Sequence, residues 1–352
     1  MNENSIKFLS PSKIHLINEC GYRYLLSQIK RKDSPNKTYS ITTFLGILMH
    51  SVLELYISNR SKPIELLWDF ELDRMLDLYD ISYKRVFLYK LPYYDIKKSK
   101  FIQLLKEINF DISGYRVVSE QLLKSDLIKG KADIVYINEI EKKVKIIDLK
   151  SGPIYNLENG QKTEVKNSYL TQLLSYGYCY WKEGYEPNNI SCALQGISKT
   201  EYFQLKFTSD DYNRHGDYLL RMKKKFNHSI RQGEEIELAN PESSMCNYCE
   251  FNFQCRPLHD YLEKNNHSSI FLVKDSYTQF FDNSSTINIA HNRTKNILQR
   301  IPNEIYRKIK DLVNQKKVVL LTGLYHDSHV DISYWTNFSR YHEIEQPHPS
   351  ST

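Results

Sequence analysis

Two apolar segments separated by a charged turn place the strongest constraint on how this chain folds. The first runs from Gly130 to Ile137 and the second from Lys145 to Gly152, and β-branched and aromatic residues are frequent in both. This composition is typical of strands. Residues 138–143 between them are polar and charged, so the two segments are predicted to form a hairpin.

The hairpin carries acidic and basic residues where its two arms meet. Because side chains alternate along a strand, Asp148 and Lys150 are expected on one face and Leu149 on the other. Asp133 lies near the start of the first arm. A carboxylate at the start of one strand can meet a carboxylate and an ammonium group at the end of its neighbour. That arrangement suits a divalent metal ion.

The composition limits the class of protein. A chain of 352 residues with 41% hydrophobic residues can form one large domain with elaborations, or two domains. The net charge of +6 permits an anionic partner without proving one. No signal peptide or apolar stretch of transmembrane length is found, which predicts a cytoplasmic protein without a membrane partner. In that compartment, six cysteines are better explained as metal ligands or buried thiols than as disulfides.

Hydrophobic periodicity predicts an α/β protein with a mixed sheet covered by helices. Helices are expected around residues 14–25 and 43–56, and residues 154–166 are expected to be a polar, mobile loop. The other expected elements are a strand at 115–123 containing Glu120, the hairpin, a helix at 167–181, strands at 190–197 and 202–207, and a helix at 210–231.

Several polar residues allow two interpretations. His50, in the second helix, is taken alone an ordinary polar residue at a helix boundary. Gln172 and Tyr176 lie four residues apart on one helix face, where they could serve the site or only pack. Tyrosines and lysines alternate in residues 83–100. This pattern suits a single-stranded nucleic acid, although ordinary core and solvated surface explain it better.

The closely spaced Cys246, Cys249 and Cys255 predict a metal-binding knuckle. A four-thiolate site needs one more ligand, and Cys20 is available. Cys179 and Cys192 lie in apolar contexts and are expected to be buried thiols.

From about Ser10 to Pro257, the chain resembles RecB-type nucleases of the PD-(D/E)xK superfamily. The resemblance is to the branch with an iron-sulfur cluster, found in AddB-type helicase-nuclease subunits and in the CRISPR adaptation exonuclease. The matching motifs are Gly46 to His50, Gly130 to Asp133, Asp148-Leu149-Lys150, Gln172 with Tyr176, and the four cysteines Cys20, Cys246, Cys249 and Cys255.

The resemblance implies a restriction-endonuclease-like fold and a role for each matching residue. His50, Asp133, Asp148 and the Leu149 carbonyl would hold Mg²⁺ or Mn²⁺, and Lys150 would orient the attacking water. Glu120 would act as a second-shell acid or bind a second metal, and Gln172 and Tyr176 would position the scissile strand or brace the site. The four cysteines would hold a [4Fe-4S] cluster, with zinc as the rival occupant.

The predicted function is a metal-dependent DNA nuclease, most simply an exonuclease on single-stranded or frayed ends in repair, recombination or defence. An endonuclease of the same fold and a noncatalytic nucleic-acid-binding subunit are the alternatives. The sequence lacks a Gly-x-x-x-x-Gly-Lys-Ser/Thr phosphate loop, so a helicase or other repair or defence partner would lie on a separate chain.

The predicted domain organisation has two parts. Residues 1–263 are expected to form the nuclease domain, with a helical insertion at about 59–112 and the cysteine knuckle at 244–257. Residues 264–352 form an extension of unknown role, with a helix at 302–315, a strand at 318–323 and a disordered polar end. Residues 326–331 contain two histidines and two aspartates, and are expected to be a loop rather than a metal site.

Overall fold

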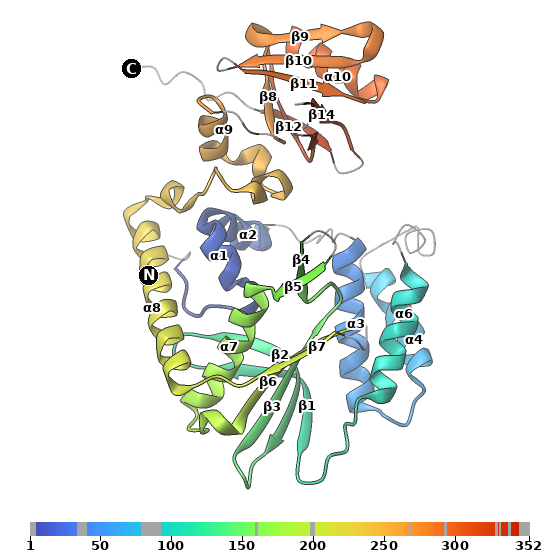
Figure 1. The fold of residues 1–352 in the computed structure, drawn as a ribbon, viewed down its shortest axis with the longest axis vertical. Helices are drawn as coiled ribbons and strands as arrows, with labels where there is room; N and C mark the ends of the chain where they lie inside the picture. The colour runs from blue at the N-terminus through green and yellow to red at the C-terminus, as the bar shows by residue number, and fades with distance from the viewer. Residues whose placement is uncertain are drawn as a thin grey trace. The chain divides into compact units, whose positions relative to one another are not determined.

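The computed structural model describes residues 5–33, 41–78, 93–158, 161–197, 201–265, 267, 269–291, 294–327, 330, 332–336 and 339–344. The chain divides into two compact units (Figure 1). The N-terminal unit comprises Met1–Asn18 and Gln28–Arg231, and the C-terminal unit comprises Glu19–Ser27 and Gln232–Thr352. No helix among the described residues combines the length and the apolar character needed to cross a membrane.

A five-stranded mixed sheet forms the centre of the N-terminal unit, in the order β1-β2-β3-β6-β7. Its strands are β1 (Arg116–Lys124), β2 (Lys129–Asn138), β3 (Lys143–Lys150), β6 (Ile190–Gly196) and β7 (Tyr202–Leu205). Neighbouring strands are antiparallel except for the parallel pair β3 and β6. A parallel pair needs a long crossover, and here α7 (Asn167–Lys182) lies within that connection. The predicted hairpin and the predicted order of strands and later helices are therefore present. The single helix expected around residues 14–25 is instead two helices that meet at Cys20.

Helices cover both faces of this sheet (Figure 1). On one face, α3 (Ile41–Ser58), α4 (Ile64–Leu78) and α6 (Tyr94–Glu107) share a hydrophobic core with Ile134 and Ile147 of the sheet. On the other face, α7 packs against β3 and β6, and α8 (Ser209–Gln232) packs on α7. A sheet covered on both faces explains why β2 is continuously buried from Ala132 to Asn138.

Shorter elements complete the N-terminal part of the fold. They are the 3₁₀ turn η1 (Pro11–Lys13), α1 (Ile14–Glu19), α2 (Gly21–Asp33), and the hairpin of β4 (Tyr155–Glu158) and β5 (Gln161–Val165). The hairpin corrects the prediction of a mobile loop over residues 154–166. Its two strands pair antiparallel, so the backbone groups of this polar segment bond to each other.

The C-terminal unit contains far more regular structure than was predicted. One sheet has the order β13-β14-β11-β10-β9 and another the order β15-β12-β8. The elements are α9 (Arg256–Leu262), β8 (Phe271–Val273), β9 (Thr278–Phe281), β10 (Thr286–His291), β11 (Thr294–Gln299), α10 (Asn303–Asn314), β12 (Val318–Thr322), β13 (Tyr325–Asp327), β14 (Ile332–Tyr334) and β15 (Arg340–Ile344). The predicted helix and strand correspond to α10 and β12. Part of the segment predicted as a loop at 326–331 belongs to β13.

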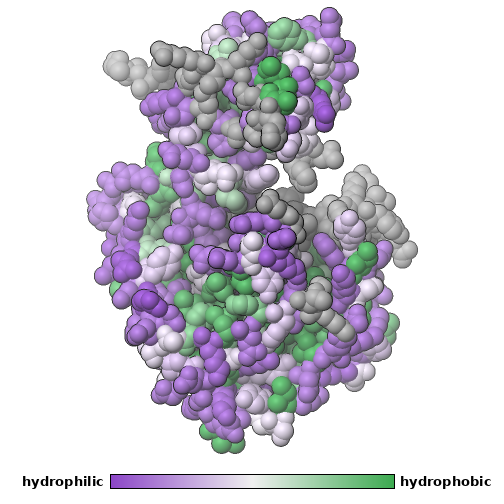
Figure 2. Space-filling model, viewed as in Figure 1, coloured by the Kyte–Doolittle hydropathy of each residue, from purple (hydrophilic) through white to green (hydrophobic). Residues whose placement is uncertain are grey.

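Residues 232–263 fall in the C-terminal compact unit, and the domain boundary at residue 263 stays a prediction. Cys246, Leu258 and Leu262 pack with Leu272 and Leu320 in one hydrophobic cluster, so the cysteine segment belongs to the C-terminal unit. The polar end at 345–352 and the tyrosine-rich residues 83–90 lie outside the described residues. Hydrophilic side chains dominate the face shown in Figure 2, and hydrophobic residues show there only in patches.

Candidate active site

Three neighbouring strands bring three carboxylates to one level of the sheet. The register of β1 with β2 puts Glu120 opposite Asp133. The register of β2 with β3, continued by one residue beyond Ile134 and Ile147, puts Asp133 opposite Asp148. Residues opposite each other on adjacent strands are about 5 Å apart. The fold therefore gathers three acidic side chains from three consecutive strands.

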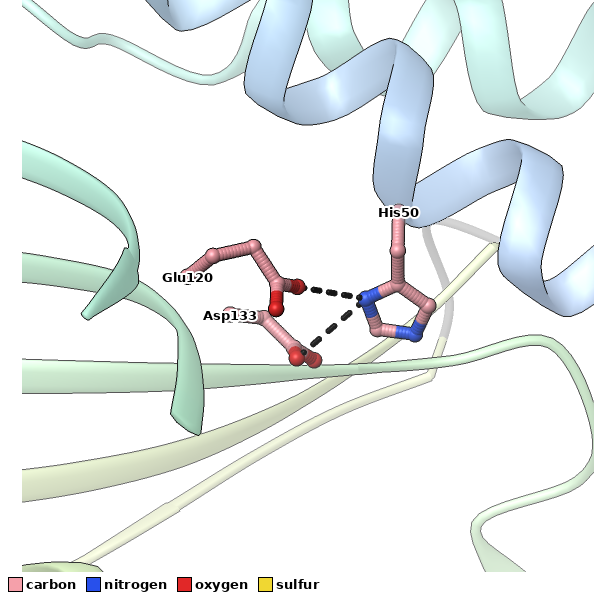
Figure 3. Close-up of side chains that lie close together, drawn as sticks. All are labelled: His50, Glu120 and Asp133. Atoms are coloured by element: carbon pink, nitrogen blue, oxygen red, sulfur yellow. Dashed lines mark ion pairs between the residues drawn. The ribbon is translucent and has the colours of Figure 1, made fainter. Parts of the chain in front are cut away.

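Helix α3 supplies an imidazole to this group (Figure 3). His50 Nδ1 lies 3.3 Å from Glu120 Oε1 and 3.3 Å from Asp133 Oδ1. One potential ligand atom from each of the three residues lies within 4.8 Å of the others. Burial opposes a positive charge on His50, but Asp133 and then Glu120 outweigh it and raise its pKa to about 10. A metal ion bound here would replace that proton.

Glu120 is held in an uncommon backbone conformation. Its φ is 49° although it lies within β1, and a non-glycine residue in this left-handed region costs about 1–3 kcal/mol. This strained residue supplies one of the two carboxylates that contact His50. Observed strain of this kind is characteristic of functional sites.

Asp148, Lys150, Gln172 and Tyr176 form a connected network beside the His50 group. Lys150 Nζ donates to Gln172 Oε1 at 2.9 Å, and Gln172 Nε2 donates to Asp148 Oδ1 at 2.9 Å. Gln172 Nε2 also donates to the Tyr176 hydroxyl at 2.8 Å, and that hydroxyl donates to the Lys131 carbonyl at 2.7 Å. Gln172 and Tyr176 are buried. Their polar groups are thus engaged with the strands that carry the acids.

Asp148 faces Lys150 across the site. Its buried Oδ2 lies 2.6 Å from Lys150 Nζ in an ion pair and has no further hydrogen-bond partner among the described residues. Burial raises the pKa of Asp148; the charge of Lys150 opposes this and that of Asp133 adds to it. A buried acid near two further carboxylates offers the oxygen ligands that a divalent cation prefers.

Leu149 contributes its main chain to the site. Its N–H donates to Asp133 Oδ2 at 2.6 Å, which fixes the orientation of that carboxylate. The family resemblance implied a role for the Leu149 carbonyl, and that role stays a prediction. The hydrogen bond from the Leu149 N–H to Asp133 is an additional contact that strand alternation does not reveal.

All these residues line one cleft of about 800 Å³ in the N-terminal unit. The lining residues that the sequence analysis did not single out are Ser12, His15, Ile47, Ser51, Glu54, Lys131, Lys166, Ser168 and Tyr169. Lys150 Nζ lies 4.4 Å from the centre of the Tyr169 ring, within the range of a cation–π interaction. Tyr169 precedes Gln172 by three residues, so helical spacing was the signal that could have found it.

The four thiols expected to bind a metal line a second, small cavity in the C-terminal unit. Cys20, Cys246, Cys249 and Cys255 contribute to it, and its volume is about 20 Å³. Burial, and to a smaller extent the nearby Cys255, Cys249 and Cys20, raise the pKa of Cys246 to about 12. Burial likewise raises the pKa of Cys255 to about 11. Cys179 and Cys192 are buried and do not line this cavity.

The thiols are near one another without reaching the spacing of a single-ion site. Across the described residues, His50, Glu120 and Asp133 are the one group of three or more candidate ligands with atoms within 4.8 Å of one another. No three of the cysteine sulfurs therefore approach that closely. Tetrahedral zinc with ~2.3 Å bonds would need sulfurs about 3.8 Å apart.

Comparison with known proteins places this geometry in a family. The family model described as the PD-(D/E)XK nuclease superfamily matches residues 8–256. The chain belongs to the PD-(D/E)XK nuclease superfamily. Its match includes every residue of the cleft network, and the superfamily implies a DNA substrate and a divalent metal. No curated protein matches.

Two solved structures also show similarity to the chain. A "Putative exonuclease" from Eubacterium rectale is 11% identical, with 65% of this chain and 82% of that chain covered and a TM-score of 0.37. The protein SSO0001 is 16% identical, with coverages of 60% and 96% and a TM-score of 0.26. Because these scores are low, the assignment to the PD-(D/E)XK superfamily rests on the family model.

Proposed function

We propose that this chain is a metal-dependent DNA nuclease that hydrolyses phosphodiester bonds, acting as an exonuclease on single-stranded or frayed ends. The observation that carries the proposal is the group of His50, Glu120 and Asp133, which lies beside the contact between Asp148 and Lys150. Repair, recombination or defence in the cytoplasm are the processes that such an activity would serve. A helicase or other partner would then be a separate chain.

The metal ligands would be His50, Asp133 and Asp148, with the Leu149 carbonyl as a further oxygen. Glu120 and Asp133 both lie 3.3 Å from His50, so we assign Glu120 to the same ion as Asp133 rather than to a second ion. A bound Mg²⁺ or Mn²⁺ would lower the pKa of a water and neutralise charge that develops on the phosphate. Asp133, held by the Leu149 N–H, would present its other oxygen to that ion.

Lys150 would act on the attacking water and on the phosphate. Its ammonium group is held between Asp148 Oδ2 and Gln172 Oε1 and lies over the Tyr169 ring. A positive charge fixed in a mostly buried position stabilises negative charge in the transition state more than a solvated charge does. We therefore assign Lys150 as the catalytic cation.

Gln172 and Tyr176 would brace the site rather than contact the scissile strand. Both amide N–H groups of Gln172 donate within the network, and its carbonyl accepts from Lys150. Tyr176 ties this network to the main chain of β2. Correct placement of Asp148 and Lys150 is what these bonds would supply.

A cleavage assay tests the proposal and separates it from its alternatives. Single strands labelled at one end, and blocked in turn at each terminus, are incubated with Mg²⁺ or Mn²⁺ and with chelator. An exonuclease shortens a strand only from a free terminus, so it leaves a circular single strand intact. An endonuclease also cuts the circular strand. Equal cleavage by the native chain and by Lys150→Ala, or none by either, would contradict the nuclease assignment and favour a noncatalytic binding subunit.

We also propose that Cys20, Cys246, Cys249 and Cys255 hold a [4Fe-4S] cluster. The four cysteines line one cavity although they are far apart in the sequence, and this supports a shared occupant. The small cavity suits a single ion better, which keeps zinc as the rival. The absorption spectrum and metal content of protein purified without oxygen decide between them. A colourless protein with stoichiometric zinc would refute the cluster.

A further inference from the structure

The outer face of α8 carries an unbalanced group of positive charges. Arg221, Lys223, Lys224, Lys225 and Arg231 lie within eleven residues, and none forms an ion pair with any residue that the structure describes. Most of them are exposed. Elsewhere in the N-terminal unit, lysines on α6 are paired with acids on α4. The positive charges of α8 are therefore available to bind an anionic partner.

The spacing of these charges works against helix stability. Arg221 is followed at three and four positions by Lys224 and Lys225, so like charges are neighbours on the helix surface. Each such pair costs about 0.2–0.5 kcal/mol. An open groove of about 640 Å³ runs along this part of the helix, lined by Leu220, Lys223, Lys224, Lys225, Asn227, His228 and Arg231. We call these seven residues the α8 basic groove.

Helix packing places the later part of α8, which carries the α8 basic groove, alongside the start of α7. Tyr212, near the start of α8, stacks on Trp181, near the end of α7, and His215 contacts Ser175 in the middle of α7. The helices are therefore antiparallel, as Figure 1 also shows. The later part of α8 lies toward the start of α7, where Ser168 and Tyr169 line the cleft.

A second connection limits the distance between groove and cleft. Asn227 of the groove bonds to both the N–H and the carbonyl of Ile6. Ser12, six residues later, lines the cleft. Six extended residues span at most ~20 Å, which about six nucleotides cover at ~3.4 Å per nucleotide. A strand bound in the cleft can therefore reach the groove.

We propose that the α8 basic groove binds the phosphate backbone of the single strand whose end occupies the cleft. This inference rests on the proposed nuclease function. Lysines without acidic partners suit phosphates, which they contact without reading sequence. The groove would hold the strand several nucleotides from the scissile bond, so its contribution would depend on strand length.

The test compares two triple variants with equal loss of charge. One replaces groove residues: Lys223→Gln, Lys224→Gln and Lys225→Gln. The matched control replaces lysines of the helical insertion that also have no ion pair with a described residue: Lys62→Gln, Lys97→Gln and Lys100→Gln. Binding of fluorescent single strands of about 4 and about 15 nucleotides is measured by anisotropy with chelator present, across a range of salt concentrations.

The groove variant should lower the salt dependence for the longer strand only. Each lost phosphate contact reduces the slope of log K against log salt by about 0.7 for single strands, so three lost contacts reduce it by about 2. Cleavage of the 4-nucleotide strand should be unchanged. Thermal stability should not fall, because the replaced lysines have no acidic partner to lose.

Other outcomes overturn the inference and remain distinct from failure of the nuclease assignment. An unchanged slope in the groove variant, or an equal fall in the control, rejects the groove even if the native chain cleaves DNA. Loss of binding to vesicles of anionic lipid with DNA binding unchanged would reassign the surface to a membrane. A length-dependent effect on binding without any cleavage would leave the groove in place and reject the nuclease.

Discussion

At the scale of single residues, Glu120 combines a functional position with a strained backbone. Its φ of 49° lies in the left-handed region, where Asn is tolerated better than other non-glycine residues. We predict that the free energy of unfolding of the Glu120→Asn variant is about 1 kcal/mol higher than that of the Glu120→Gln variant. Both substitutions remove the carboxylate, so both should strongly reduce metal-dependent cleavage. Chemical denaturation and the cleavage assay measure the two effects.

The comparison between Asn and Gln isolates the backbone contribution, since either change also relieves repulsion between Glu120 and Asp133. Equal stabilities would mean that the left-handed conformation stores no strain. Native-like cleavage in either variant would remove Glu120 from the proposed metal ligands.

Tyr169 gives a second prediction because its ring contacts Lys150. A cation–π contact in a partly desolvated site contributes about 1 kcal/mol. We predict that Tyr169→Leu lowers kcat about five- to tenfold with little change in KM, while Tyr169→Phe keeps near-native kcat. Steady-state kinetics on a short single strand tests this. If the Phe variant is as impaired as the Leu variant, the hydroxyl matters and the ring contact does not.

Much of the candidate site followed from periodicity. Strand alternation put Asp148 and Lys150 on one face of their strand, and helical spacing put Gln172 and Tyr176 on one face of their helix. In the structure Gln172 bonds to both Asp148 and Lys150. The direct contact of Glu120 with His50 did not follow from the sequence. It depends on a strand register and a left-handed residue that no local pattern specifies.

At the scale of elements, the contact between α7 and α8 contains a buried histidine. Ser175 Oγ donates to the Thr171 carbonyl at 2.7 Å, so its oxygen accepts from His215 Nε2 at 2.9 Å. This assigns the neutral form of His215 with its proton on Nε2. Burial lowers the pKa of His215 to about 4.

The lowered pKa of His215 predicts an acid-sensitive helix contact. His215 takes up a proton near pH 6.5 in the unfolded chain but only near pH 4 in the folded chain. Below pH 6.5 this difference stabilises the unfolded chain, so the free energy of unfolding falls by about 3 kcal/mol as the pH drops from 6.5 to 4. We predict that His215→Gln loses less stability than the native chain over this range. Urea unfolding at several pH values measures the difference.

His228 provides the matched control, because it lies exposed on the same helix. His228→Gln should lose stability with falling pH as the native chain does. If His215→Gln also follows the native curve, the histidine is not held neutral in the folded chain.

Elements with strong periodicity were predicted within about two residues, and the helix at 167–181 corresponds to α7 at Asn167–Lys182. The hairpin of β4 and β5 was missed because polarity was taken as a sign of a loop. The Asn159-Gly160 dipeptide in that segment is a hairpin signal. Most strands of the C-terminal unit were missed because they are only three to six residues long. Short strands depend on distant partners more than on local composition.

At the scale of the whole molecule, four cysteines tie the start of the chain to its C-terminal unit. Cys20 lies in the N-terminal helical region, and Cys246, Cys249 and Cys255 follow more than two hundred residues later. All four belong to the C-terminal unit. Cys246 also packs in the hydrophobic cluster with Leu258 and Leu320. The long separation could not reveal from sequence which unit the cysteines would join.

The proposed metal of the four cysteines would therefore stabilise the C-terminal unit more than the N-terminal unit. Metal binding to thiolates contributes directly to folding free energy, and the raised thiol pKa values of Cys246 and Cys255 show how unfavourable the charged thiols are without it. We predict that Cys249→Ser makes residues 232–344 exchange amide hydrogen much faster, with little change in β1, β2 and β3. Hydrogen exchange followed by mass spectrometry resolves the two units.

Cys179→Ser, which changes a buried thiol outside the cavity, should keep the metal and the slow exchange of the C-terminal unit. Faster exchange in both units of Cys249→Ser would instead mean that the metal stabilises the whole chain, and unchanged exchange with the metal lost would remove its structural role.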